Sequence, residues 1–158
     1  MATHHLSRSA YERLRAEFED LSTRGRIQVA EKIERARELG DLSENGDYHA
    51  AKDEQGQMEG RIRHLESILE GAEIVEASDD GRVGLGSVVT VLFAGDADDE
   101  AQTYLIGHIE EQAAGYEMMS DKSPLGQALI GASQGDTVRY TTPTGAELSV
   151  RVVRVALP

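Results

Sequence analysis

The sequence contains no cysteine and no tryptophan, and it has only two phenylalanines and three prolines. Without cysteine there is no disulfide framework and no thiolate metal site, and nothing points to an oxidising compartment. Hydrophobic residues make up 39% of the chain. With so few large aromatics, any core must be modest. We therefore expect 158 residues to form one ordinary domain or two small ones.

Long apolar runs are also missing. The first nine residues lack the apolar segment of a signal peptide, and the longest apolar stretch, near residues 88–94, is interrupted by Thr90. That stretch is too short to span a bilayer. The five histidines are dispersed, and no sequence motif for a phosphate loop, an esterase nucleophile or a zinc protease occurs. We expect a cytoplasmic protein with no membrane partner and no small-molecule substrate.

Positive charge is scarce, with 16 basic against 29 acidic side chains and a formal net charge of −13. This balance argues against a protein that holds nucleic acid by bulk electrostatic attraction, because such binding needs clustered Lys and Arg. Residues 1–75 contain 11 basic and 16 acidic side chains, whereas residues 76–158 contain 5 and 13. Most of the basic residues therefore lie in the first half of the chain.

Residues 7–38 contain no proline and only one interior glycine, Gly25. Apolar residues spaced by three and four predict a helix with one buried stripe, at Tyr11, Leu14, Phe18 and Leu21. After residues 23–25 the stripe slips, and it resumes at Val29, Ile33 and Ala36. We interpret the slip as a stutter, or a local weakening, within one continuous helix.

A second helical segment has a regular heptad pattern, at Tyr48, Ala51, Gln55, Met58, Ile62, Leu65 and Leu69. The short connection around residues 40–47 forces the two arms to fold back antiparallel. We expect Gly40 to cap the first arm and Ser43 or Asp41 to cap the second. An arm of roughly 32 residues would reach about 45 to 50 Å. Residues 1–76 are thus predicted to form a coiled-coil hairpin.

Residues 77–86 are rich in Ser, Asp and Gly and are predicted to be a linker. Beyond them, alternating apolar residues predict five strands and one short helix, Pro124 to Ile130, capped by Ser123. The strands are expected at residues 87–93, 103–108, 116–119, 137–142 and 147–155. The predicted fold class is α+β, with a helical hairpin followed by a small antiparallel-sheet domain over residues 87–158.

Asp41 and Glu44 lie three residues apart at the end of the predicted hairpin. Two carboxylates at this spacing can share a hard cation such as Mg²⁺, but a partner must complete the coordination shell. The alternative is that these acids, with Ser43 and Asp47, are only helix caps and first-turn charges. A hairpin tip needs no particular acid in order to turn, and a long solvated rod has no folding reason to exist. Both observations favour a functional tip.

Basic residues on the arms also allow two interpretations. Arg35 and Arg37 fall opposite Lys52 when the turn centres near Glu44. Interspersed with acidic residues, they are typical of solvated helix faces with i,i+4 pairs. The other interpretation is a small basic patch behind the tip, which could hold a short single strand of nucleic acid by its phosphates.

Three segments resemble one family, the bacterial Gre transcript cleavage factors. They are residues 37–55 (RELGDLSENGDYHAAKDEQ), residues 59–62 (EGRI) and residues 123–131 (SPLGQALIG). The resemblance covers essentially the whole chain. The limited basic patch and the acidic balance are more similar to the GreA branch than to the more basic GreB branch.

The resemblance implies a coiled-coil hairpin joined to an FKBP-like domain, and bacterial RNA polymerase as the partner. Family members insert the hairpin into the secondary channel when the polymerase has backtracked. Asp41 and Glu44 match the tip carboxylates that help the polymerase hold Mg²⁺ and hydrolyse the displaced 3′ end of the nascent RNA. Arg37 and Lys52 match the RNA-facing basic patch, although arginine is common at the Lys52 position.

Further residues match the family's polymerase-docking segment, namely Ser123 and Pro124. Lys122 precedes them where Asn or Asp is common. The leading hypothesis is an elongation factor that has no nuclease activity alone and binds no cofactor tightly. One rival is a channel-binding regulator that inhibits or retunes the polymerase; the presence of both Asp41 and Glu44 favours the cleavage factor. Another rival is a prolyl isomerase, but the second half has no obvious aromatic-lined pocket.

Overall fold

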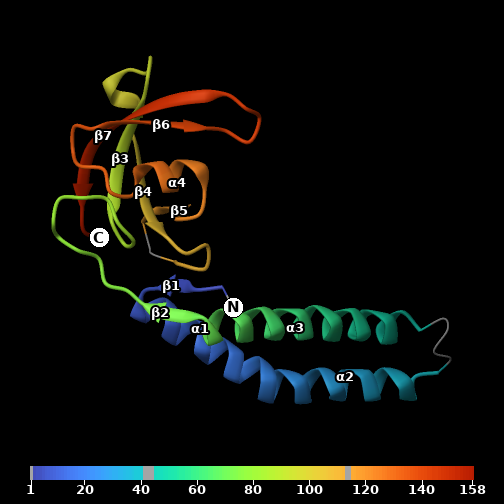
Figure 1. Ribbon diagram of the computed structural model, residues 1–158. Helices are drawn as coiled ribbons and strands as arrows, with labels where there is room; N and C mark the ends of the chain where they lie inside the picture. The colour runs from blue at the N-terminus through green and yellow to red at the C-terminus, as the bar shows by residue number, and fades with distance from the viewer. Residues whose placement is uncertain (1, 41–44, 113–114) are drawn as a thin grey trace. The chain divides into compact units, whose positions relative to one another are not determined.

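The computed structural model describes residues 2–40, 45–112 and 115–158. The chain divides into two compact units. The hairpin unit comprises Tyr11–Ala72 with the first residues of the chain, and the sheet unit comprises His4–Ala10 and Glu73–Pro158. Figure 1 shows the elements of each unit. No helix among the described residues is both long enough and apolar enough to cross a lipid bilayer.

The hairpin unit has two helical arms (Figure 1). The first arm runs through α1 (Arg8–Asp20), a π-helical segment η1 (Leu21–Gly25) and α2 (Arg26–Glu38). The second arm is the uninterrupted helix α3 (Gly46–Glu70), which packs alongside α2. The predicted hairpin is confirmed, and the predicted stutter in the first arm coincides with the π-helix.

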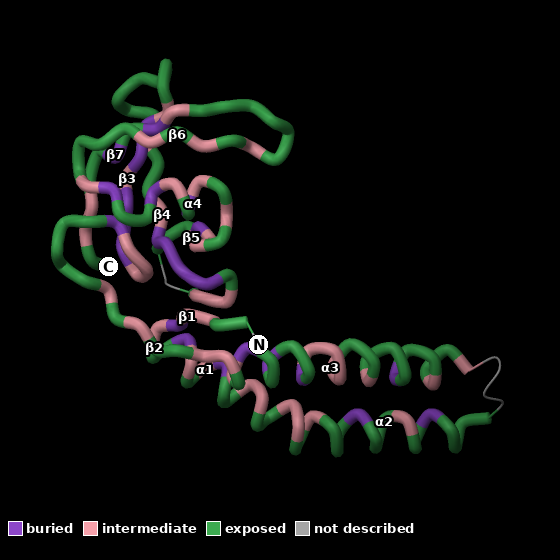
Figure 2. Tube along the Cα trace, in the orientation of Figure 1, coloured by how far each residue is buried: buried purple, intermediate pink, exposed green. Residues whose placement is uncertain are grey.

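Small and aliphatic residues form the seam between the arms. Figure 2 shows buried positions recurring along α2 and α3, and they are Val29, Ala36, Ala51, Ile62, Leu65 and Ile68. The predicted seam is wrong at its last position, because Ile68 is 1% exposed whereas Leu69 is only half-buried. Each residue of an α-helix turns by about 100°, so near the end of α3 the side chain that faces the first arm is Ile68 and not its neighbour Leu69.

Ion pairs join the arms across the seam. The Glu17 carboxylate accepts hydrogen bonds from Arg61 at 2.7 and 3.0 Å, and Glu59 accepts from Arg26 at 2.8 and 3.0 Å. Another pair joins Lys32 Nζ to Glu54 at 3.0 Å. Bidentate pairs of this kind fix orientation as well as distance. They therefore specify the register between the two arms.

The sheet unit contains a five-stranded sheet in the order β5-β4-β3-β7-β6, with one helix, α4 (Pro124–Leu129). Its strands are β3 (Val88–Phe93), β4 (Gln102–Gly107), β5 (Glu117–Ser120), β6 (Thr137–Thr141) and β7 (Glu147–Ala156). A 3₁₀ turn, η2 (Asp98–Glu100), precedes β4. All five predicted strands and the helix are confirmed, and so is the α+β class.

The sheet is mainly antiparallel, as predicted, but one of its pairings is parallel. β3 pairs antiparallel with β4 and β7, and β6 pairs antiparallel with β7, but β4 and β5 run parallel. Two short strands, β1 (His4–Leu6) and β2 (Ala72–Ile74), form a separate two-stranded sheet that the sequence pattern did not predict. Three residues are too few to show an alternation of period two.

The core of the sheet unit is one continuous cluster. Its buried members come from β3, β4, β5, α4 and β7 and from the segments beside them, and they are Val83, Val89, Val91, Ile106, Met119, Leu129, Ala132, Val150 and Val152. Val83 lies in the stretch predicted to be a linker, yet it is 2% exposed. β-Branched residues dominate this cluster because they pack well on a pleated sheet. The result is a small aliphatic core with aromatic residues only at its margin.

Candidate functional site

The predicted tip carboxylates, Asp41 and Glu44, lie outside the described residues, as do the predicted N-caps Ser43 and Asp41. The described residues on either side of the tip end α2 and begin α3. α2 ends at Glu38, and Gly40 follows with φ of 137°, a conformation that glycine adopts without steric cost. The expected role of Gly40 in ending the first arm is consistent with this backbone.

Asn45 joins the two arms at the base of the tip. Its Oδ1 accepts a hydrogen bond from the backbone N–H of Tyr48 at 3.1 Å, and it is therefore the N-cap of α3. Its Nδ2 donates to the carbonyl oxygen of Ala36 in the last turns of α2. The N-cap prediction was wrong: the cap is Asn45, not Ser43 or Asp41. The signal was present, because Asn is among the preferred N-caps and directly precedes the helix.

The charged residues at the two helix ends beside the tip match the helix dipoles. Asp47 lies in the first turn of α3, where the partial positive charge of the helix dipole favours an acid. Arg35 and Arg37 lie in the last turn of α2, where the dipole favours cations. The tip therefore lies between a helix end that carries bases and a helix start that carries an acid.

The two residues of the predicted basic patch are both exposed, Arg37 on α2 and Lys52 on α3. Lys52 Nζ donates to Gln55 Oε1 at 2.9 Å, so it is held on its own helix by a neutral partner. This partner carries no charge. Arg37 and Lys52 are thus two exposed cations, one on each arm.

Behind the tip, a groove of about 390 Å³ lies between α2 and α3. Small residues line it, namely Ala36, Ala50 and Ala51, together with Arg35 and Leu39 among others. Leu39 is 72% exposed although it is a large apolar residue. The sequence analysis did not identify this groove, because its alanines match an ordinary coiled-coil seam.

The predicted docking residues, Ser123 and Pro124, start α4. Ser123 Oγ accepts from the backbone N–H of Gly126 at 3.0 Å and donates to the carbonyl oxygen of Ser120 at 2.8 Å. A Cβ atom on Gly126 would lie 2.2 Å from the same carbonyl oxygen, so only glycine fits there. Ser123 therefore has a structural role as N-cap, whereas Pro124 is exposed.

A histidine pair links the N-terminal segment of the sheet unit to the segment after β4. His108, 6% exposed, accepts a hydrogen bond at Nδ1 from the backbone N–H of Glu110 at 3.0 Å. Its Nε2 must then carry the proton and donate to His4 Nδ1, 2.9 Å away. Burial, and secondarily the nearby His4, lower the pKa of His108 below its usual value of 6.5. Both rings are therefore bonded in their neutral forms.

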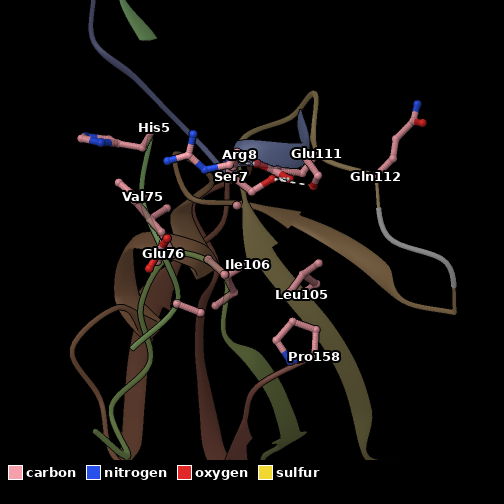
Figure 3. A pocket seen from close by; sticks show the side chains of 15 residues that line it. His5, Ser7, Arg8, Val75, Glu76, Leu105, Ile106, Glu111, Gln112 and Pro158 are labelled. Atoms are coloured by element: carbon pink, nitrogen blue, oxygen red, sulfur yellow. Dashed lines mark hydrogen bonds between the residues drawn. The ribbon is translucent and has the colours of Figure 1, made fainter. Parts of the chain in front are cut away.

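Nearby, a cavity of about 340 Å³ opens within the sheet unit (Figure 3). Ser7, Arg8 and Glu111 lie at one end of it and Pro158 at the other (Figure 3). The Glu111 carboxylate accepts from the Ser7 backbone N–H at 2.7 Å and from Ser7 Oγ at 2.8 Å. Both carboxylate oxygens of Glu111 thus already accept hydrogen bonds from Ser7. Among the described residues that line the cavity there is no Phe or Tyr, so it does not resemble an aromatic proline pocket.

A metal site is not formed by the part of the chain that the structure describes. Within residues 2–40, 45–112 and 115–158, no group of three or more His, Asp or Glu side chains is placed to hold an ion. The sequence has no Cys to add.

Comparison with known protein families gives two matches that together span nearly the whole chain. Residues 4–74 match the family described as "Transcription elongation factor, N-terminal", and residues 78–157 match "Transcription elongation factor, GreA/GreB, C-term". The GreA transcription elongation factor of Streptomyces coelicolor is 44% identical over 150 residues, which is 94% of this chain and 90% of that protein. The GreA of Mycobacterium tuberculosis is 44% identical over 151 residues, 94% of this chain and 91% of that protein.

Solved structures with similar sequences belong to the same group of proteins. GreA factor homolog 1 of Thermus thermophilus is 31% identical, with 98% of this chain and 99% of that chain covered and a TM-score of 0.39. The GreA/GreB factor of Nitrosomonas europaea is 24% identical, with the same coverage and a TM-score of 0.40. Because both TM-scores are low, family membership rests on the sequence matches.

Proposed function

The chain belongs to the GreA/GreB transcription elongation factor family, and on that premise we propose that it rescues backtracked RNA polymerase by stimulating the polymerase's own cleavage of nascent RNA. The hairpin enters the secondary channel, and the tip reaches the active centre. The protein has no nuclease activity by itself. Its substrate is the displaced 3′ end of the RNA, presented only within the polymerase complex.

The observation that carries this proposal is the position of Asp41 and Glu44 in the sequence between two clasped helices. α2 ends at Glu38 and α3 begins at Gly46, and Asn45 bonds to both helices. This clasp, made by Asn45, joins α2 to α3 without using either acid as the N-cap of α3. Neither carboxylate is therefore needed to cap the described helix.

Mg²⁺ fits the donor set at the tip. Carboxylate oxygens are the hard ligands that Mg²⁺ prefers, and this ion is commonly bound by one or two carboxylates while other ligands complete its shell. Asp41 and Glu44 would supply those two carboxylates, and the polymerase and the RNA the remainder. Held by these residues, Mg²⁺ would lower the pKa of an attacking water and would stabilise the developing charge of the phosphodiester.

The basic residues and the start of α4 fit two further parts of the proposal. Arg37 and Lys52 are exposed cations near the tip and suit the phosphates of a short single strand. Pro124, exposed at the start of α4, suits a protein-docking surface that Ser123 supports from beneath as N-cap. The hairpin unit would thus act on RNA, and the sheet unit would bind the polymerase.

The test is RNA cleavage in a purified, backtracked bacterial elongation complex with Mg²⁺. Wild type is compared with Asp41→Asn, with Glu44→Gln and with no factor, while binding to the polymerase is measured separately. Both substitutions preserve shape and remove only the negative charge. We expect strong stimulation by wild type, a loss of stimulation in both variants, and unchanged binding.

Two other outcomes would reject this function. If wild type binds the polymerase and leaves cleavage unchanged or reduces it, the protein is a regulator that occupies the channel without stimulating cleavage. If the variants lose binding and activity together, the tip is a docking element and not the working site.

A further inference from the structure

The two arms of the hairpin differ in their helical periodicity. Leu14 and Val29 are 0% and 2% exposed, and they lie fifteen residues apart on the first arm. Four turns over fifteen residues require 3.75 residues per turn, more than the 3.6 of an α-helix. From Val29 to Ala36 the spacing returns to seven. The excess of one residue therefore lies between Leu14 and Val29.

The π-helix η1 (Leu21–Gly25) lies within that interval. A π-helix closes its hydrogen bonds over five residues rather than four and so accommodates an inserted residue. Without it, steps of seven from Leu14 would reach Leu21, Gln28 and Arg35. In the structure Gln28 and Arg35 are exposed, and the neighbouring Val29 and Ala36 are buried instead.

Three side-chain features support the π-helix. Ser22 Oγ donates to the carbonyl oxygen of Phe18, and Thr23 Oγ1 donates to that of Glu19, each at 2.6 Å. Gly25 faces the second arm, and a Cβ atom there would lie 3.0 Å from Met58 Sδ. The hydroxyls bond to backbone carbonyls just before the wide turn, and the glycine lets α3 approach it closely.

We propose that Ser22, Thr23 and Gly25 are positioning residues: by holding the π-helix, they set the face that α2 presents to α3 and keep Arg35 outside the seam. This inference rests on the proposed function, because its consequence is the orientation of the tip and of the RNA-facing cations. A regular α-helix of the same sequence would turn Arg35 into the seam and Val29 toward solvent.

The orientation of α2 can be measured without the polymerase. Since the chain has no cysteine, a single introduced thiol reports its own exposure. In the parent protein, Gln28→Cys should react with iodoacetamide about tenfold faster than Val29→Cys, because an exposed thiol needs no local opening. Adding Ser22→Ala/Thr23→Ala should shrink this ratio several-fold. An unchanged ratio overturns the role of the hydroxyls.

A deletion variant keeps the inference testable if the double alanine variant fails to fold. Removing Thr23 leaves Leu14 and Val29 fourteen residues apart, which is two heptads, so the arm can become a continuous α-helix in the same orientation. The ratio of thiol reactivities should then match the parent. Deletion of Glu31, which lies in regular α-helix, is the matched control and should expose Ala36→Cys. If both deletions disturb the seam equally, the inference is wrong.

Cleavage assays then connect orientation with function. Ser22→Ala/Thr23→Ala should lower the cleavage rate at saturating factor roughly tenfold, since misplacement of catalytic groups acts on the rate, and should leave the half-saturating concentration unchanged. Ser22→Thr/Thr23→Ser, which keeps both hydroxyls, should restore the rate. A changed thiol ratio with an unaffected rate would overturn the positioning role. If wild type itself does not stimulate cleavage, the proposed function fails, while the thiol ratios still decide the orientation of α2.

Discussion

In the hairpin unit the buried residues follow a single line between two helices, whereas in the sheet unit they form one cluster to which four strands and a helix contribute. A side chain in a line has support from one partner helix, while a side chain in a cluster is supported from several directions. A change in the hairpin seam should therefore propagate to the tip. A change in the sheet unit should stay local and affect binding or stability alone.

The largest effect is expected at the centre of the seam. Leu65 is fully buried, so Leu65→Ala should lower the free energy of unfolding of the hairpin by about 2–5 kcal/mol, through lost burial and a residual cavity. Urea denaturation followed by far-UV circular dichroism measures it. Gln57→Ala, on the exposed face of the same helix, is the control. If the two variants are equally stable, the assignment of Leu65 to the seam is wrong.

A smaller effect is expected at the clasp. Asn45→Ala removes the N-cap of α3 and the bond to Ala36, and should cost about 1–2 kcal/mol. The rate of stimulated cleavage at saturation should fall more than the affinity for the polymerase.

Asn45→Asp separates the two bonds made by this residue. The aspartate keeps the acceptor for Tyr48 but loses the donor to Ala36. If Asp restores stability but not the cleavage rate, the bond between the arms positions the tip. If Asn45→Asp restores both the stability and the cleavage rate, the bond to Ala36 does not position the tip and Asn45 acts only as an N-cap.

In the sheet unit, we expect loss of the N-cap Ser123 to affect polymerase binding and not the cleavage rate. Ser123→Ala removes the N-cap of α4 and should destabilise the unit by about 1 kcal/mol. We expect weaker polymerase binding with an unchanged cleavage rate at saturation, measured by titrating the factor. Ser123→Thr, which keeps the capping hydroxyl, should restore binding. A reduced rate at saturation would mean that the sheet unit also acts on chemistry.

The smallest effect is the pH dependence of the histidine pair. Because the pKa of His108 is lowered on folding, the unfolded chain takes up its proton first, at about pH 6.5. Its contribution to stability is complete above that pH and falls as the pH drops toward the lowered pKa. His4 and Lys122 oppose protonation, and Asp121 and Glu110 favour it.

Calorimetry at pH 7.5 and 5.5 measures this dependence, with His108→Gln as the comparison. The glutamine amide can still donate to His4 but does not titrate. The variant should lose less stability on acidification than wild type. An equal loss in both proteins would assign the pH dependence to other groups.

The regular elements of both units were predictable because their periodicities are strong. The heptads of α3 and the alternation in β6 and in the middle of β7 each turn one face inward, and the sequence shows that face directly. The parallel pairing of β4 with β5 was not predictable, because local alternation says nothing about which strands become neighbours or in which direction they run.

The details of the candidate site were harder to predict than the fold. The slip before Val29 revealed an irregularity, but a stutter and a π-helix produce the same sequence pattern and differ only in backbone hydrogen bonding. Asn45, Ser43 and Asp41 are all good N-caps, so propensity alone could not choose among them. The roles of Asp41, Glu44, Arg37 and Lys52 stay predictions, since they depend on a partner.

The measurement that tests the central claim most directly is the Mg²⁺ dependence of RNA cleavage in the backtracked complex, with and without saturating factor. If Asp41 and Glu44 help to hold the metal ion, wild type should lower the Mg²⁺ concentration needed for half-maximal cleavage. Asp41→Asn should return that concentration to its value without factor. An unchanged Mg²⁺ requirement, with wild type bound to the polymerase, would contradict the account.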